Sequence, residues 1–439
     1  MKFDEIKLPK PLKNALDEQG IVSPTVIQRK AIPSILAGND VIGIAQTGTG
    51  KTIAYLLPIL RDLKFSDQRP PRILILVPTR ELVVQVASEI EKLTTYMSVR
   101  TLSIYGGTNI NTQKKAVYEG CDIVVATPGR LYDLAMTGLL RLKQIQKIVI
   151  DECDEMLNLG FRPQLQRIFD LLPTKRQNLM FSATITQDVD DLIETFFRKT
   201  EKIIAAPTGT PLSSISQSAY KVPNFNTKFN LLKALLEKND TLDKIFIFVK
   251  SKALADRLFL KIEETFPESF GVIHSNKSQN FRLRMVREFK DNQLRGIVAT
   301  DLVSRGIDIE NVSHVINFDI PDHQEQYMHR IGRTGRVDQQ GYAISFVTDD
   351  ELNDFKAIED YMQLEVGFES LPEDVEISKE LIPEEEEPDI HDAPTILKAS
   401  HSVGEGNKNE VSTKIKKTEN FRPRDKSNKK IRKKRKRRK

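Results

Sequence analysis

The segment AQTGTGKT, residues 45–52, constrains the fold most, because it directly follows the apolar run VIGIA at 41–45. Gly48 and Gly50 allow backbone N–H groups to surround an anion, and a helix that follows would direct its positive N-terminus at the same anion. In such a loop Lys51 reaches the β- and γ-phosphates of a nucleotide, and the Thr52 hydroxyl binds Mg²⁺. The segment therefore predicts a strand, a phosphate-binding loop and a helix; the alternative is a glycine-rich turn without a ligand.

Short, continuously apolar runs recur through residues 1–365, as in parallel strands that are covered on both faces. The segments between them have room for crossover helices. The stretch APTGTPLSSIS is rich in Pro, Gly, Ser and Thr and is typical of a linker. We therefore expect two α/β domains, at 1–206 and 217–365, joined by a linker at 207–216. The expected strands are 41–45, 73–77, 101–105, 122–126, 147–151, 179–183, 244–249, 271–274, 296–300, 314–318 and 343–347.

The net charge of +5 conceals two oppositely charged segments near the C-terminus. Residues 366–413 contain thirteen acids and three lysines, and residues 414–439 contain sixteen Lys/Arg and two acids. Low hydrophobicity and blocks of like charge predict disorder in both segments. The basic segment is expected to bind RNA phosphates without sequence preference; a localisation signal is the alternative. The acidic segment could compete with RNA for it.

The composition indicates the cellular compartment in which the chain acts. It has two cysteines, Cys121 and Cys153, which is no disulfide framework and fits a reducing compartment. The N-terminus has no apolar core of signal-peptide length, and no run of 18 apolar residues occurs. We expect a soluble cytoplasmic protein that does not cross a membrane.

The apolar run KIVID ends in Asp151 and Glu152, followed by Cys153 and Asp154. A carboxylate at the end of a strand that faces a phosphate loop can hold Mg²⁺, and the adjacent Glu can accept a proton from an attacking water. No His/Cys cluster lies near Cys153 in the sequence, so a zinc site lacks ligands, and a nucleophile would need a neighbouring base. We interpret Cys153 as a small buried residue between catalytic acids.

A second cluster lies in the later domain, where HRIGRTGR at 329–336 spaces Arg330, Arg333 and Arg336 three residues apart. Arginines supplied from a second domain can stabilise a transferring phosphoryl group and link hydrolysis to closure. The alternative is a basic helix end that faces solvent.

Taken together, the ordered motifs resemble the DEAD-box family of ATP-dependent RNA helicases in superfamily 2, with DECD in place of DEAD, over about residues 1–350. The matching blocks are Phe3, PTVIQ (24–28), AQTGTGKT, PTREL (78–82), GG (106–107), TPGR (127–130), DECD (151–154), SAT (182–184), QNFR (279–282), ATDLVSRGIDI (299–309) and HRIGRTGR. HSNKSQNFR and KRQNLMFSAT further resemble the bacterial RhlE-like subgroup.

The resemblance implies two RecA-like domains and a role for each matching residue. The nucleotide, ATP with Mg²⁺, would be bound by Phe3, Gln28, Ala45, Gln46, Thr47, Gly48, Thr49, Gly50, Lys51, Thr52 and Asp308, with Thr52 and Asp151 as metal ligands. Catalysis would involve Lys51, Asp151, Glu152, Arg333 and Arg336. Coupling between the nucleotide and RNA would involve Asp154, Ser182, Thr184 and His329. RNA sugar and phosphate groups would contact Arg80, Gly107, Thr127, Arg130, Arg282 and Thr300.

The sequence thus predicts a helicase that clamps single-stranded RNA and separates short RNA duplexes through RNA-stimulated ATP hydrolysis. We expect it to act as a monomer, with ribosomal or RNA-decay proteins as candidate partners. Two alternatives from other classes remain. The chain could be an RNA clamp without processive unwinding, or a superfamily 2 helicase that acts on DNA.

Overall fold

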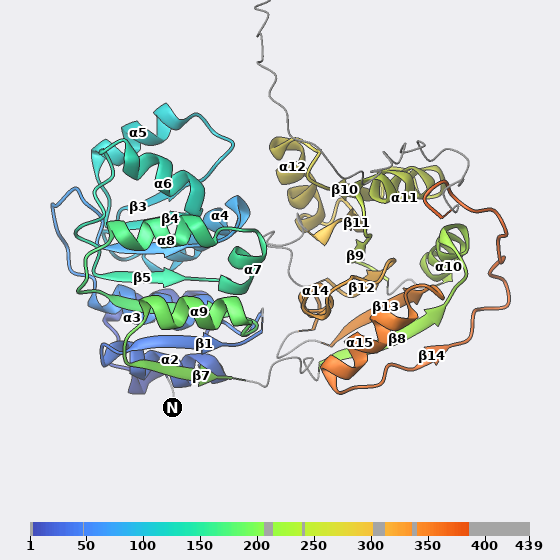
Figure 1. The fold of residues 1–439 in the computed structure, drawn as a ribbon, viewed down its shortest axis with the longest axis horizontal. Coiled ribbons are helices and arrows are strands. Elements are labelled where there is room, and N and C mark those ends of the chain that lie inside the picture. Colours follow the sequence, from blue (N-terminus) through green and yellow to red (C-terminus); the bar gives the residue numbers. More distant parts are fainter. Residues whose placement is uncertain are drawn as a thin grey trace, which may run out of the picture. The chain divides into compact units, whose positions relative to one another are not determined.

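A computed structural model describes residues 3–46, 48–205, 214–238, 242–301, 312–335 and 340–385. Within them lie two seven-stranded sheets in which all the strand pairs are parallel (Figure 1). The expected class, two α/β domains with mostly parallel sheets, is confirmed.

The N-terminal sheet has the strand order β3-β4-β2-β5-β6-β1-β7. Its strands are β1 (Asp40–Ile44), β2 (Ile73–Leu76), β3 (Thr101–Ile104), β4 (Ile123–Ala126), β5 (Lys147–Ile150), β6 (Gln177–Ser182) and β7 (Thr200–Ile204). Its helices are η1 (Phe3–Glu5), α1 (Lys10–Glu18), α2 (Val26–Leu36), α3 (Lys51–Asp62), α4 (Arg80–Leu93), α5 (Ile110–Glu119), α6 (Pro128–Met136), α7 (Cys153–Asn158), α8 (Arg162–Leu171) and α9 (Gln187–Phe196).

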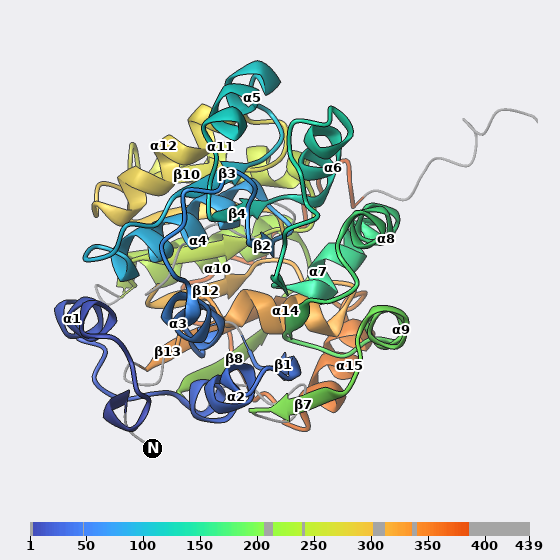
Figure 2. The ribbon, with the colours of Figure 1, turned by 90° about the vertical axis from the view of Figure 1, so that its left-hand side faces the viewer.

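These helices cover both faces of the N-terminal sheet, which explains why its central strands are apolar throughout. One buried cluster joins the sheet to α1, α2, α3 and α4, and a second joins it to α5, α6, α7, α8 and α9. Figure 2 shows the two groups of helices on opposite sides of the strands. Because all the strands are parallel, the loops that follow β1, β5 and β6 meet at one edge of the sheet. The predicted phosphate loop, DECD and SAT segments all lie there.

The C-terminal sheet has the order β10-β11-β9-β12-β13-β8-β14. Its strands are β8 (Ile215–Lys221), β9 (Ile245–Phe248), β10 (Phe270–Ile273), β11 (Gly296–Ala299), β12 (His314–Asn317), β13 (Gly341–Val347) and β14 (Phe368–Glu369). Buried clusters join it to α10 (Phe225–Lys238) and α11 (Lys252–Thr265), and separately to α12 (Gln279–Lys290), α14 (Gln324–Ile331) and α15 (Leu352–Met362).

Every apolar run expected to be a strand forms one, but three strands were not expected. They are β7, β8 and β14. Strands β7 and β14 lie at sheet edges, and β8 lies next to the two-residue β14. All three strands have exposed residues, so their sequences include polar side chains and form no continuous apolar run. Strand β8 begins at Ile215, so the last two residues of the expected linker belong to the C-terminal domain.

The expectation of disorder from residue 366 onward is wrong for residues 366–385. After β14, residues 370–385 form an extended segment, here called the C-terminal strap, that packs on α10 and α11. Val375 and Ile382 are buried in the same cluster as these helices. The composition of this stretch is dominated by acids, so two apolar residues within it did not indicate a folded segment.

Polar contacts also hold the strap. Nδ2 of Asn224 donates to the Ser378 carbonyl oxygen at 2.7 Å. Nδ2 of Asn226 donates to the carbonyl oxygen of Glu380 at 2.8 Å. Glu385 Oε1 accepts a hydrogen bond from the first N–H of α10 at 2.6 Å, where a carboxylate stabilises a helix.

The strap limits the competition hypothesis, because its last acids are already engaged. Glu384 pairs with Arg257 at 3.0 Å and Glu385 binds α10. Residues 386–413 and the basic segment 414–439 lie outside the described residues, so competition remains a hypothesis for those residues. Among the described residues, no helix is long and apolar enough to cross a membrane.

Candidate nucleotide and RNA site

The loop between β1 and α3 has the backbone of a phosphate-binding loop. Gly48 and Gly50 have φ angles of 79° and 86°, in the left-handed region that favours glycine, and α3 begins at Lys51. Lys51 is only 7% exposed, and among the described residues its Nζ has no hydrogen-bond partner. A buried ammonium without a partner is costly, so this lysine suits a site that a nucleotide phosphate fills.

Gln28 lies beside this loop on the first turn of α2. Its Nε2 donates to the Gly50 carbonyl oxygen at 3.1 Å, and its Oε1 accepts from the Thr25 N–H at 3.0 Å. A Cβ on Gly50 would lie 2.4 Å from Nε2, so the contact requires glycine. The adenine contact of Gln28 stays a prediction, whereas its hydrogen bond to Gly50 supports the phosphate loop. That role depends on a contact across 22 residues, which the sequence does not reveal.

Two predicted catalytic acids lie at the end of β5. Asp151 is buried, and its Oδ1 and Oδ2 accept hydrogen bonds from the Glu152 N–H at 3.0 Å and the Tyr55 hydroxyl at 2.9 Å. Burial raises the pKa of both carboxyls, while the Lys51 charge opposes the rise. Glu152 adopts a left-handed conformation, with φ 52° and ψ 53°. Such backbone strain in a non-glycine residue is typical of functional sites.

Cys153 is the first residue of α7 and is fully buried in the N-terminal core, and burial raises the pKa of its thiol. No group of three His, Cys, Asp or Glu able to hold a metal occurs among the described residues. A buried neutral thiol is a poor nucleophile and a poor ligand. The interpretation of Cys153 as a small packing residue agrees with these observations.

Asp154 connects the acidic loop to the segment that follows β6. Its Oδ2 accepts hydrogen bonds from the Ala183 N–H at 3.1 Å, and from the Thr184 N–H and hydroxyl, both at 2.9 Å. The Ser182 hydroxyl accepts from the Asp154 N–H at 3.2 Å. Burial acts to raise the pKa of Asp154, but the charges of His329 and Lys51 and these hydrogen bonds hold it below its ordinary value. The four predicted coupling residues therefore interact.

The three arginines of the HRIGRTGR motif differ in role. Arg330 is 1% exposed and makes a bidentate pair with Asp301, at 2.6 and 2.7 Å. It therefore anchors α14 to the end of β11 and is not available to a phosphate. Arg333 is half-buried, and its charge is among those that lower the pKa of Glu152 against the effect of burial. Arg336 lies outside the described residues.

Four predicted RNA contacts lie in the N-terminal domain. The Arg80 guanidinium lies over the Tyr105 ring, 4.6 Å from its centroid, and beside Gly107, whose φ of 77° favours glycine. Thr127 is the N-cap of α6. Arg130 Nη1 donates to the Thr108 carbonyl oxygen at 3.0 Å. These groups follow β2, β3 and β4.

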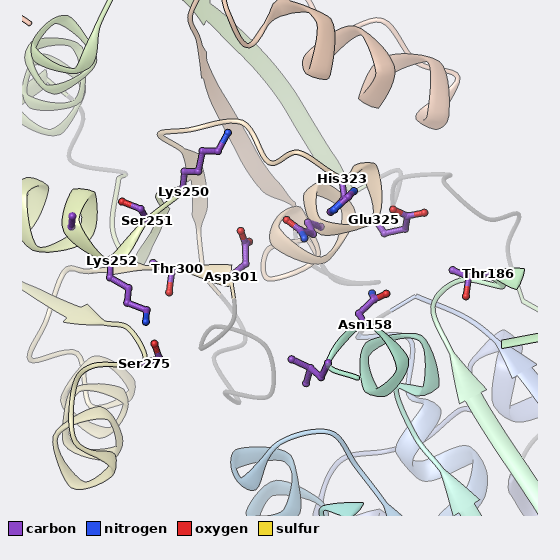
Figure 3. A pocket seen from close by; sticks show the side chains of 13 residues that line it. Asn158, Thr186, Lys250, Ser251, Lys252, Ser275, Thr300, Asp301, His323 and Glu325 are labelled. Atoms are coloured by element: carbon purple, nitrogen blue, oxygen red, sulfur yellow. The ribbon is translucent and has the colours of Figure 1, made fainter. Parts of the chain in front are cut away.

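The two predicted RNA contacts of the C-terminal domain, Arg282 and Thr300, follow β10 and β11. Arg282 lies in the first turn of α12 near Glu81, with 3.7 Å between its Nη1 and the Glu81 Oε1. Thr300 lines a cavity of about 860 Å³ together with residues that sequence reasoning missed: Lys250, Ser251, Lys252 and Ser275. Figure 3 shows these side chains around Thr300. In the sequence these residues are indicated by VKSK at 249–252, which directly follows β9 and includes Ser251, the N-cap of α11.

The remaining predicted residues fall into two groups. Phe3 is buried in the N-terminal core, Ala45 is buried at the end of β1, and the Thr49 hydroxyl donates to the Gln46 carbonyl oxygen at 2.7 Å. Thr47 and Asp308 lie outside the described residues, so their roles stay predictions.

Comparison with known proteins agrees with this geometry. Residues 25–192 match the model of DEAD/DEAH box helicases, and residues 227–338 match that of the helicase conserved C-terminal domain. The chain is 36% identical to the ATP-dependent RNA helicase DbpA of Bacillus subtilis over 86% of this chain and 78% of that protein. It is 38% identical to the DEAD-box ATP-dependent RNA helicase CshA of Geobacillus kaustophilus over 81% and 76%.

Among solved structures, Saccharomyces cerevisiae Dbp5 bound to RNA and ADP BeF3 is similar, with a TM-score of 0.77 at 28% identity. The similarity covers 84% of this chain and 95% of that one. It agrees with two RecA-like domains. From the matched domains, the fold and the site, this chain belongs to the DEAD-box family of ATP-dependent RNA helicases.

Proposed function

We propose that the chain works as an ATP-gated clamp on single-stranded RNA and separates short RNA duplexes locally. The observation that carries the proposal is the Asp154 cluster. One carboxylate oxygen accepts three hydrogen bonds from residues 183–184, and the same carboxylate lies in the field of Lys51 in the phosphate loop. A change of charge at the phosphates would therefore act, through Asp154, on the segment that follows β6.

Thr52 and Asp151 are the residues that would hold Mg²⁺. The buried Asp151 carboxylate beside the phosphate loop fits a hard divalent cation, which takes oxygen ligands. When bound, Mg²⁺ supplies positive charge against the β- and γ-phosphate oxygens. Lys51 Nζ would bind the same phosphates, and Gln28 would keep the loop in place through Gly50.

Glu152 is proposed as the group that orients the attacking water and accepts its proton. Its pKa, raised by burial, moves toward the working pH, as a general base requires. Arg333, with Arg336 as a predicted partner, would stabilise the charge that develops on the transferred phosphoryl group. Hydrolysis would then depend on the two domains acting together.

RNA would be held by groups that touch its backbone and leave sequence unread. In the N-terminal domain these are Arg80, Gly107, Thr127 and Arg130, and in the C-terminal domain Arg282 and Thr300 with Lys250 and Lys252. The RNA in the Dbp5 complex supports a role of this kind. Residues 414–439 would add a second, salt-sensitive phosphate contact.

The clamp requires ATP and RNA to favour the same state, so each must raise the affinity for the other. We expect a short single-stranded RNA to bind about ten- to a hundredfold more tightly with Mg²⁺ and a non-hydrolysable ATP analogue than with ADP. Fluorescence anisotropy of labelled RNA measures this. An Asp154→Asn variant should lose most of the difference, whereas Asp170→Asn, exposed at the end of α8, should keep it. Equal RNA affinity in both nucleotide states would rule out the clamp.

We further propose that the chain acts in the cytoplasm, since both of its cysteines are free and suit a reducing compartment. We also propose that it acts as a monomer.

Action on DNA is the second candidate function. Stimulation of ATP turnover by RNA but not by DNA of the same sequence would exclude it.

A further inference from the structure

Tyr55 is a buried aromatic residue in the first half of α3, the helix that follows the phosphate loop. It follows Lys51 by one turn and is 0% exposed. Its ring packs against Phe181 of β6, with centroids 5.3 Å apart, and its hydroxyl donates to Asp151 Oδ2 at 2.9 Å. A buried phenol needs a hydrogen-bond partner, and many polar groups could serve. Here the partner is Asp151, the acid beside the phosphate loop, which indicates a role in the site.

The Tyr55 hydroxyl therefore links α3, which follows the phosphate loop, to the end of β5 through the carboxylate that is proposed to hold Mg²⁺.

We infer that Tyr55 is a positioning residue that orients the proposed magnesium ligand Asp151; the inference rests on the proposed role of Asp151. Asp151 is held at both ends, by the Glu152 N–H on Oδ1 and by Tyr55 on Oδ2. Its carboxylate plane is thus fixed before the metal arrives.

Tyr55→Phe tests this by removing a single oxygen. The ring can still pack against Phe181, but the Asp151 carboxylate loses one of its two hydrogen-bond donors. Mutation of a residue that orients a metal ligand commonly lowers the metal affinity ten- to a hundredfold. We expect the affinity of the ADP complex for Mn²⁺, used as a paramagnetic probe, to fall about tenfold. Electron paramagnetic resonance of free Mn²⁺ in titrations of the full chain measures it.

Tyr220→Phe is the matched control. It also removes a phenol bonded to a carboxylate, Glu369 at 2.5 Å, but in the C-terminal sheet. We expect it to leave the Mn²⁺ affinity unchanged. ADP affinity in EDTA should be the same in both variants and in the native chain.

Unchanged Mn²⁺ affinity in Tyr55→Phe would overturn the inference. So would an equal loss of ADP affinity in EDTA, which would indicate a general disturbance of the phosphate loop. A native chain whose ADP complex binds no Mn²⁺ would instead contradict the proposed metal ligands, so the two failures can be told apart.

Discussion

Replacing Glu152 with Gln is expected to lower the turnover of ATP by about 10²- to 10⁴-fold, the range for loss of a general base. Glutamine keeps the size of the side chain but cannot accept a proton. The variant should still bind nucleotide, because the phosphate groups would be held by Lys51 and the glycine loop and not by Glu152. Steady-state ATP hydrolysis at saturating RNA, with ADP affinity measured separately, checks both statements.

The pH dependence sharpens this prediction. Burial raises the pKa of Glu152, so the carboxylate is protonated, and the rate falls, at a higher pH than for an ordinary glutamate of pKa 4.5. This acid limb should be missing from the residual activity of Glu152→Gln. Glu194→Gln, exposed on α9, should retain native turnover. Native turnover in Glu152→Gln would remove Glu152 from the mechanism.

Replacing Lys228 with Met is expected to destabilise the C-terminal domain by about 3–5 kcal/mol, the cost of breaking a buried ion pair. Lys228 is 3% exposed and pairs with Asp319 at 3.0 Å and Glu351 at 2.9 Å. Burial acts to lower the pKa of Lys228, but the two acids keep it above its ordinary value. Without the cation, two carboxylates face each other in a site with little water.

Calorimetry suits this test, since the chain has no tryptophan for fluorescence. The transition of the C-terminal domain should shift to a lower temperature by several degrees. Lys233→Met, on the exposed face of the same helix α10 with only a 3.9 Å pair to Glu237, should leave the transition within about 1 °C. Equal effects of the two substitutions would show that the buried triad contributes little.

The extent to which the fold could be predicted follows from which residues each strand buries. Central strands such as β2 and β9 are buried throughout, so an apolar run reveals them. The edge strand β7 has one buried residue, Ile203, and therefore looked like loop. The C-terminal strap was missed for a related reason. Its acidic composition outweighs its two apolar anchors, and its backbone is bound by Asn224 and Asn226, at the start of α10, which lie 154 residues away in the sequence.

The candidate site divides in the same way. Residues within one motif, such as Gly48, Lys51 and Asp151, could be named from the sequence because loop and chemistry are local. The contacts of Gln28 with Gly50, of Tyr55 with Asp151 and of Arg330 with Asp301 depend on how separate elements pack. Arg330 looked equivalent to Arg333 in the motif, yet it is a structural anchor.

The central claim is that RNA and ATP act on one coupled site, and steady-state ATP hydrolysis with and without single-stranded RNA tests it most directly. The account predicts low turnover of the native chain alone and a strong increase, tenfold or more, when RNA is added at saturation. DNA of the same sequence should give little increase. Equal turnover with and without RNA would contradict the account, because the phosphate site would then hydrolyse ATP independently of bound RNA.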